Sequence, residues 1–290
     1  TTIPTVSSVT SNTDDGSYKI GDAIAITATF TEAVTVTGTP QIDLNTGNTY
    51  LSFDGVDDRL DLPLISDVSS IAFWVNISSS QDGSDNDYLI DARTGLDEGY
   101  LQANGTTGLR PGWSKLYMNG VEITDFTNSS FIEDSWIFVY LEAATSFTDD
   151  ITFMSHHGTG YSSNVFLDAN MDELAMWNET LTASEITTLY NSGSGLSALS
   201  NSGNYTSASN LKGYWNFNEG SGTTLTDQTS NSNDGTISGA SYGTRGTSVN
   251  YASGSGGSTL TFNYTVVAGH TSSDLDYTST SALSLNSGTI

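Results

Sequence analysis

Cysteine is absent from this chain of 290 residues, and only seven of its residues are lysine or arginine. Without cysteine, neither disulfides nor thiolate metal ligands can contribute to the structure. The basic residues are outnumbered by 33 acidic ones, which gives a net charge of −26. Nucleic-acid binding needs a basic surface, and this composition excludes one. The chain also has no run of about 18 apolar residues, so we expect no membrane insertion.

Alternating apolar and polar residues predict β-strands near both ends of the chain. Residues 23–30 and 259–267 alternate with the period of two that places apolar side chains on one face of a strand. Residues 41–44 continue this texture, and residues 45–48 (NTGN) interrupt it. Each end segment has too few strands to close a sandwich, but together they nearly do. We therefore expect an all-β fold.

The middle of the chain has a different composition, because all five tryptophans lie there. Strands are predicted at 71–77, 136–141 and 171–178. Residues 182–190 predict the single helix, since Thr182 and Glu185 have the spacing of a capping box and precede an apolar face. Residues 192–210 are rich in Ser, Asn and Gly and lack the texture of a strand.

The two end segments resemble the bacterial Ig-like repeats of large RTX-type surface adhesins. The resemblance lies in VSSVTSNTDDGSYKIGDAIAITATFTEAVTVTGTPQIDLNTG and VNYASGSGGSTLTFNYTVVAGHTSSDLDYTSTSALSLNSGTI. In that repeat LNTG runs almost directly into VNYASGSG, whereas here about one further domain intervenes. The resemblance implies that residues 1–47 and 248–290 form one split Ig-like domain on a bacterial cell surface. The repeat normally continues past NSGTI into a further strand.

The middle segment resembles the concanavalin A-like jelly rolls of the laminin G/pentraxin type. The stretches that carry this resemblance are FDGVDD, LYMNGV, MDELAMWNETLTASEITTLYNSG and GYWNFNEGSGTTLTDQTSNSNDGTI. In that family the last of these stretches usually comes first. The resemblance therefore implies that residues 48–247 are an inserted, circularly permuted jelly roll, with residues 192–210 as the joint. We expect the insertion to fall in a loop after Leu44.

Calcium is the cofactor that we expect, because oxygen ligands are abundant and Ca²⁺ prefers them. The resemblance to concanavalin A-like folds implies a structural ion between Glu219 and Asp172, with Asp227 and Asp234 as further ligands. The alternative for Asp172 is a carboxylate that caps a turn.

A second candidate calcium group lies at residues 82–87. Asp82, Asp85 and Asp87 are spaced around a glycine, similar to the start of an EF-hand loop, although no glutamate follows at the right spacing. The alternative is an acidic hairpin turn.

A sugar site needs an exposed aromatic face beside hydrogen-bonding groups. Four tryptophans lie in apolar stretches and are expected in the core, namely Trp74, Trp136, Trp177 and Trp215. Trp113 differs, because it ends the loop Arg110-Pro111-Gly112-Trp113 and is predicted to bind ligand. Its predicted companions in ligand binding are Arg110, Arg93, Tyr100, Asn104 and Tyr161. For the two arginines the alternative is a local ion pair.

We do not expect an enzyme. The sequence has no G-x-S-x-G nucleophile motif and no E-x-D-x-E strand of the glucanase type. His156 and His157 are adjacent and would face opposite ways on a strand, so they are expected to be ordinary surface or loop residues.

The sequence predicts a calcium-dependent ligand-binding module of a large bacterial adhesin, projected sideways from an Ig-like stalk. The expected ligand is a glycan on a host cell or surface, and the expected neighbours are further Ig-like domains of the same polypeptide. We expect the module to be monomeric and extracellular. The alternatives are a spacer or protein-binding module without a glycan ligand, and an enzyme acting on glycans.

Overall fold

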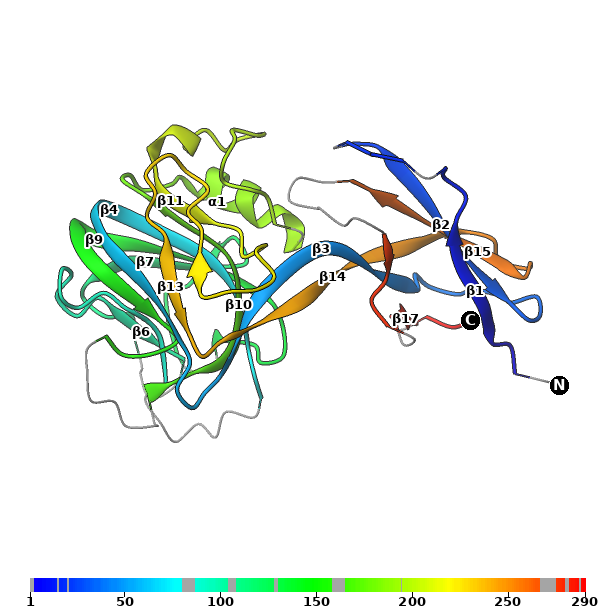
Figure 1. Cartoon of the computed structure of the whole chain (residues 1–290), viewed down its shortest axis with the longest axis horizontal. Helices are drawn as coiled ribbons and strands as arrows, with labels where there is room; N and C mark the ends of the chain where they lie inside the picture. The colour runs from blue at the N-terminus through cyan, green and yellow to red at the C-terminus, as the bar shows by residue number, and fades with distance from the viewer. Residues whose placement is uncertain are drawn as a thin grey trace. The chain divides into compact units, whose positions relative to one another are not determined.

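The computed structural model describes residues 3–14, 16–19, 21–79, 87–103, 108–127, 130–157, 165–193, 195–266, 275–279, 282–286 and 288–290. The chain is all-β with antiparallel pairing, as the sequence predicts (Figure 1). It divides into a split unit, Thr1–Asn48 with Thr244–Ile290, and a central unit, Thr49–Gly243. No helix in the described ranges is long and apolar enough to cross a membrane.

The split unit contains the strands β1 (Val6–Ser11), β2 (Ala23–Phe30), β15 (Thr259–Thr265), β16 (Asp276–Tyr277) and β17 (Leu283–Ser284). β2 pairs with β1 on one side and with β15 on the other, so strands from the two ends of the chain share one sheet. The inward face of β2 buries Ile24, Ile26 and Ala28 against Leu260 and Phe262. The alternation of β2 is thus the direct cause of this core.

Two long strands carry the chain between the units. They are β3 (Gln41–Asp54) and β14 (Ser241–Ser253), which pair with each other. The prediction of a loop after Leu44 was wrong, because β3 continues through residues 45–48. Gly47 takes a positive φ of 80° within the strand, and its N–H donates to the side chain of Asn45 at 3.1 Å. A glycine adopts this conformation at little cost, so the strand absorbs the NTGN stretch instead of ending there.

The central unit contains β4 (Arg59–Ile77), β5 (Tyr88–Asp91), β6 (Tyr100–Gln102), β7 (Trp113–Met118), β8 (Val121–Glu122), β9 (Ile137–Phe153), β10 (Asp168–Trp177), α1 (Ala183–Tyr190), η3 (Asn191–Gly193), η4 (Ala208–Asn210), β11 (Leu211–Trp215), β12 (Thr224–Leu225) and β13 (Gly235–Ser238). β4 and β9 pair along most of their length, with register shifts in the middle. The first residues of β4 pair with β13, and the last residues of β9 pair with β5. The second half of β4 pairs with β10, and the first half of β9 pairs with β7.

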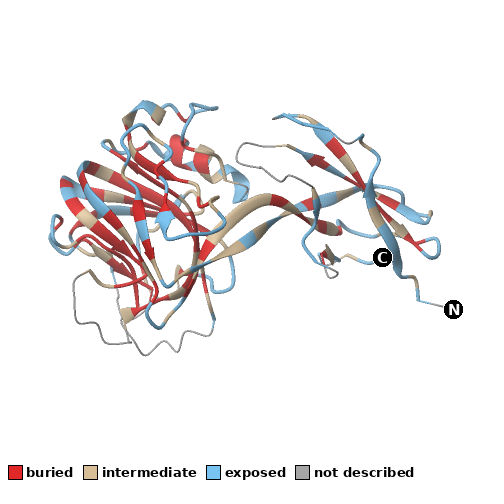
Figure 2. Cartoon of the chain, viewed as in Figure 1, coloured by how far each residue is buried: buried red, intermediate tan, exposed pale blue. Residues whose placement is uncertain are grey.

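The second half of β4 is buried on both faces (Figure 2). Ile71, Phe73 and Val75 enter the main core, while Ala72 and Trp74 enter a second apolar cluster on the opposite face. That second cluster includes Ile186 and Leu189 of α1. The helix therefore covers this face of the sheet.

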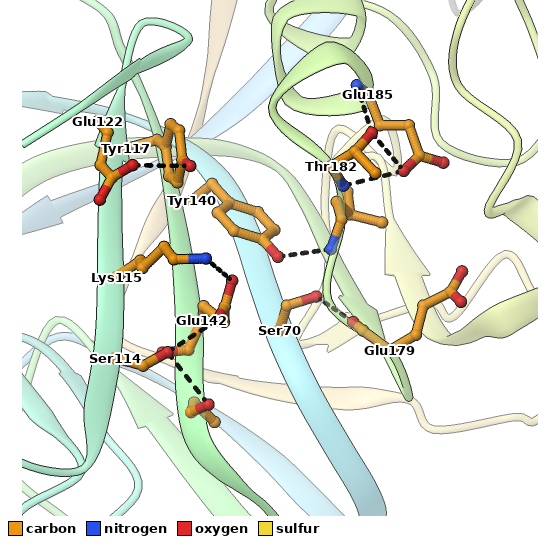
Figure 3. Close-up of polar contacts among 12 residues, drawn as sticks. Ser70, Ser114, Lys115, Tyr117, Glu122, Tyr140, Glu142, Glu179, Thr182 and Glu185 are labelled. Atoms are coloured by element: carbon orange, nitrogen blue, oxygen red, sulfur yellow. Dashed lines mark hydrogen bonds and ion pairs between the residues drawn. The ribbon is translucent and has the colours of Figure 1, made fainter.

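The helix begins where the sequence predicts. Thr182 is its N-cap, and its hydroxyl accepts from the Glu185 N–H at 3.3 Å (Figure 3). The Glu185 carboxylate in turn accepts from the Thr182 N–H at 3.0 Å, which completes the capping box. The Tyr140 hydroxyl accepts from the Leu181 N–H at 2.8 Å and so ties the helix start to β9.

The segment that follows the helix also takes part in the core. Tyr205 is fully buried, accepts a hydrogen bond from the Trp177 indole at 3.0 Å and donates one to the Ala198 carbonyl at 2.8 Å. Trp74, Trp177 and Trp215 are core residues as expected, and Trp136 is partly buried against the second cluster.

Candidate ligand-binding site

Arg93, Tyr100 and Arg110, three of the residues predicted to bind ligand, lie together in the central unit. The guanidinium carbon of Arg93 is 4.8 Å from the centroid of the Tyr100 ring, and that of Arg110 is 4.7 Å from the same centroid. Both distances are within the range of cation–π attraction. Two of the seven basic residues of the chain therefore meet on one tyrosine.

Asp91, at the end of β5, anchors Arg93. Its carboxylate is fully buried and accepts from the Arg93 Nε at 2.9 Å and Nη2 at 2.7 Å, a bidentate ion pair. The same carboxylate accepts from the backbone N–H of Arg93 at 3.1 Å and of His157 at 2.9 Å. For Arg93, the alternative of a local ion pair is thus confirmed.

The Arg93 guanidinium also lies over a second tyrosine, Tyr88. Its central carbon is 5.1 Å from the Tyr88 centroid, and the Tyr88 and Tyr100 rings are 5.6 Å apart. Burial acts to lower the pKa of Arg93, but hydrogen bonds and attraction from Asp91 outweigh it and raise the pKa above its usual value. Burial raises the pKa of the Tyr88 hydroxyl. Arg93 is therefore a permanently charged, fixed part of the site.

The loop that carries Arg110 packs closely on the start of β6. A Cβ on Gly112 would lie 2.9 Å from the backbone of Gly99 and 2.7 Å from the Asp97 carbonyl, so only glycine permits this approach. The Trp113 N–H donates to the Arg110 carbonyl at 2.9 Å and closes a turn. These contacts hold Arg110 beside Tyr100.

The prediction that Trp113 offers an exposed aromatic face was wrong. Its side chain is only 4 % exposed and belongs to the main core. Its indole N–H donates to the Tyr100 carbonyl at 3.3 Å. Trp113 begins β7, where side chains alternate between faces, and its own side chain falls on the inner face. Its hydrogen bond therefore supports the Tyr100 backbone from the core.

Arg110 differs from Arg93 in its partners. Within the described part of the chain, no carboxylate lies within ion-pair distance of Arg110. Its Nε atom is buried and has no hydrogen-bond acceptor in those same ranges. A buried donor without an acceptor costs about 1 to 3 kcal/mol, so the fold leaves the Arg110 guanidinium incompletely hydrogen-bonded.

Sequence reasoning missed four neighbours of this site, namely Asp91, Tyr88, His156 and His157. The His156 ring packs edge-on against Tyr88, with centroids 5.3 Å apart, and its Nδ1 lies 4.0 Å from the Asp91 carboxylate. The opposite charges of Asp91 and Arg93, two residues apart beside Tyr88, were the available signal. The histidines gave none, because their approach depends on the pairing of β9 with β5.

The predicted calcium ligands Glu219, Asp227 and Asp234 are engaged with each other and with the backbone. Asp227 accepts four hydrogen bonds, from the N–H groups of Tyr214, Thr229 and Asn233 and from the Thr229 hydroxyl, at 2.9 to 3.1 Å. Asp234 accepts from the Asp227 N–H at 2.9 Å. Glu219 accepts from the Thr226 N–H at 2.9 Å and from the Tyr242 hydroxyl at 3.2 Å. These carboxylates organise the residues that connect β11 to β13.

Asp172 and Asp87 are both buried. Asp172 lies within β10 opposite Trp74, beside an irregularity where Glu173 has a positive φ of 54°, so it does not cap a turn. Asp87 is 2 % exposed. Asp82, Asp85, Asn104 and Tyr161 lie outside the described residues.

One group of three carboxylates has oxygens within 4.8 Å of one another in the described ranges, and it consists of Asp54, Asp57 and Asp58. No three of the predicted ligands Asp172, Glu219, Asp227 and Asp234 come together in this way. Burial raises the pKa of Asp58, and the nearby charges of Asp54 and Asp57 add to this effect. A divalent cation would relieve that repulsion.

The site offers two fixed guanidinium groups, two tyrosine rings and an imidazole on the edge of the central unit. This arrangement can bind an anionic or polar ligand by charge-assisted hydrogen bonds and by stacking. Next to it, the Thr152 hydroxyl donates to the Asp61 carboxylate at 2.9 Å and lies 3.2 Å from the Nδ1 atom of His157. Family models, curated proteins and solved structures were all compared with the chain, and none matches it.

Proposed function

We propose that this chain is a ligand-binding module of a large bacterial cell-surface adhesin, and that its central unit binds a glycan. The observation that carries this proposal is the convergence of Arg93, Arg110 and Tyr100. Aromatic faces beside fixed hydrogen-bond donors are the features that bind sugars. In a chain of net charge −26, two arginines on one ring are too specific an arrangement to follow from composition alone.

The resemblances of the sequence supply the setting of this proposal. The split unit would be an Ig-like segment of an adhesin stalk, and the central unit an inserted, permuted concanavalin A-like jelly roll. The absence of cysteine and the acidic surface suit an extracellular bacterial protein. Neighbouring Ig-like domains of the same polypeptide would be its structural partners.

The face of the sheet beneath α1 is a poor place for a ligand. Leu181, Ile186 and Tyr205 pack there against Trp74 and Trp177 and bury them. The Tyr100 site lies instead at β5 and β6. β5 pairs with the end of β9, and β6 pairs with β5. This location favours recognition at the edge of the sandwich.

Calcium belongs to the proposal as a structural ion. Asp54, Asp57 and Asp58 fit it better than the residues predicted from the sequence, because their oxygens lie close together. Asp227 fits poorly, since its carboxylate already accepts four hydrogen bonds. Titration calorimetry with CaCl₂ on the whole chain and on Asp57→Asn tests this part, and heat that is unchanged in the variant would assign the ion elsewhere.

A glycan array with the labelled 290-residue chain tests the binding of sugars. We expect bound glycans for the natural chain, loss of binding in Tyr100→Leu, and unchanged binding in Tyr277→Leu. The second variant is the matched control, because Tyr277 lies in the split unit and is 38 % exposed. An array without bound glycans would overturn the proposal and leave a spacer or protein-binding module.

A further inference from the structure

The geometry points to an anionic sugar as the ligand, with Arg110 as the residue that binds its carboxylate or sulfate group. This inference rests on the proposed binding of glycans and adds the class of sugar and the residue that selects it. It starts from the different states of the two guanidinium groups at Tyr100.

Arg93 is already neutralised. Asp91 binds its Nε and Nη2 in a bidentate pair, and the Asp91 carboxylate is fully buried. An external anion would have to compete with this internal one, which the fold holds in place through the N–H groups of Arg93 and His157. Arg93 therefore serves to hold Tyr100 and Tyr88 in position.

Arg110 has the remaining positive charge of the cluster. In the described ranges it has no ion-pair partner, and its buried Nε has no acceptor. Because Nε is buried, an external anion would bind through the two Nη atoms, whose planar arrangement matches two oxygens of one anionic group. Because the central carbon of the guanidinium lies 4.7 Å from the Tyr100 centroid, an anion bound by Arg110 would place its sugar ring beside an aromatic ring.

The overall negative charge of the chain does not oppose this assignment. The screening length at physiological ionic strength is about 8 Å. A ligand at Arg110 therefore responds mainly to the groups around it, and distant carboxylates contribute little.

The backbone supports Arg110 closely enough for selective recognition. Gly112 approaches Gly99 and the Asp97 carbonyl within distances that a side chain would block. The Trp113 indole reaches the Tyr100 carbonyl from the core. Arg110 and its aromatic partner are thus fixed by the same two contacts, which reduces the entropy lost when a ligand binds.

Four oligosaccharides test the inference by titration calorimetry on the whole chain. They are an oligogalacturonate, its neutral galactose counterpart, a sulfated galactan oligomer and its desulfated form. We expect Arg110→Gln to weaken binding of an acidic oligomer by about 10- to 100-fold and to leave neutral oligomers unchanged. Lys212→Gln removes the same charge elsewhere in the central unit and should change affinity less than about twofold.

Arg110→Lys keeps the charge and removes the planar arrangement of donors, and its loss of affinity should fall between those of the other two variants. Tryptophan fluorescence reports whether each variant is folded, since all five tryptophans lie in the central unit. Preference for one acidic oligomer identifies carboxylate or sulfate. Equal binding of acidic and neutral oligomers overturns this inference and leaves the glycan proposal standing, whereas no binding of any glycan here or on the array overturns both.

Discussion

Asp91 and Asp227 are both buried carboxylates that accept several hydrogen bonds, but the regions around them differ. At β5 the Asp91 carboxylate binds the guanidinium of Arg93, and a second guanidinium, that of Arg110, lies over the neighbouring Tyr100 ring. Between β11 and β13 the Asp227 carboxylate binds only uncharged donors, three of them backbone N–H groups. The first region retains a group able to bind something else, and the second is complete in itself.

This difference shows how to separate a site from a scaffold. Both regions are rich in the residue types that bind ligands or metals, so composition does not distinguish them. What distinguishes them is the set of partners that each polar atom already has. Two further carboxylates extend the comparison. Glu185 accepts hydrogen bonds from several donors, whereas the Oδ2 atom of Asp149 has no hydrogen-bond partner among the described residues.

Asp91→Asn should cause the largest loss of stability. The change leaves the Arg93 side chain, of which 31 % is exposed, without its counter-charge. We expect the free energy of unfolding of the central unit to fall by about 3 kcal/mol, measured by urea denaturation and tryptophan fluorescence. Asp97→Asn, at an exposed position, is the control, and a loss below about 1 kcal/mol for Asp91→Asn would contradict the role of the ion pair.

Asp227→Asn should cost somewhat less, about 2 kcal/mol, because an amide oxygen cannot accept all four hydrogen bonds. No charged partner is left behind in this case. Asp125→Asn, also in the central unit and exposed, is the control. If a chelator lowers the melting temperature of the natural chain, and this variant abolishes that response, Asp227 is a metal ligand and the comparison fails.

Glu185→Gln should cost about 1 to 2 kcal/mol at neutral pH, with a dependence on pH that identifies the cause. Burial acts to raise the pKa of Glu185, but hydrogen bonds from Thr182, Thr206 and Ser207 outweigh it and lower the pKa to about 2. The lowered pKa stabilises the fold above the ordinary value near 4.5, and this stabilisation is lost as the pH falls toward 2.

The measurement for Glu185→Gln is urea denaturation at pH 7 and at pH 3. The difference between the natural chain and the variant should shrink at pH 3. Glu133→Gln, at an exposed position, should show no such change. A difference that is constant across this range would mean that packing at the helix cap, rather than the charge, is responsible.

Asp149→Asn should change the stability of the fold by an amount that depends on pH. Burial raises the pKa of Asp149 to about 6, and the neighbouring Asp150 contributes. The group therefore favours the fold below its ordinary pKa of 3.8, and this contribution is lost as the pH rises through about 6. Between pH 4 and pH 7 the stability of the variant relative to the natural chain should rise by about 2 kcal/mol.

Thermal unfolding of both proteins across that range measures the effect for Asp149. The Asp149 Oδ2 atom is buried and has no hydrogen-bond partner among the residues described, so ionisation is unfavourable there. A relative stability that falls with pH would mean that the ionised carboxylate has a partner, which would place Asp149 in the same class as Asp91.

Local patterns predicted much of the fold. The alternation of residues 23–30 predicts β2 to the residue, because a strand with one buried face requires it. Thr182 and Glu185 predict the start of α1, since both partners of a capping box are close in sequence. The NTGN stretch led to the wrong prediction of a loop. β3 pairs with the distant strand β14 and stays extended through this stretch.

The candidate site was predictable only in part. Positive charge is scarce in this chain, which singled out Arg93 and Arg110. The turn-forming residues Pro111 and Gly112 led to the prediction that Trp113 lies in a loop. The residue that anchors the site, Asp91, was overlooked because acidic residues are common in this chain. The burial of Trp113 depended on the packing of β7 against β9, to which no local signal points.

Composition and neighbours in the chain account for the β-strands, the capped helix and the strongly negative charge. Which polar atoms already have partners depends on the tertiary structure. In the folded chain Arg93 and Arg110 lie over one tyrosine, and Trp113 is buried. The Asp227 carboxylate accepts hydrogen bonds from three backbone N–H groups. Those outcomes depend on pairing between distant strands, and an isolated stretch of residues does not specify which distant segment will supply its partner.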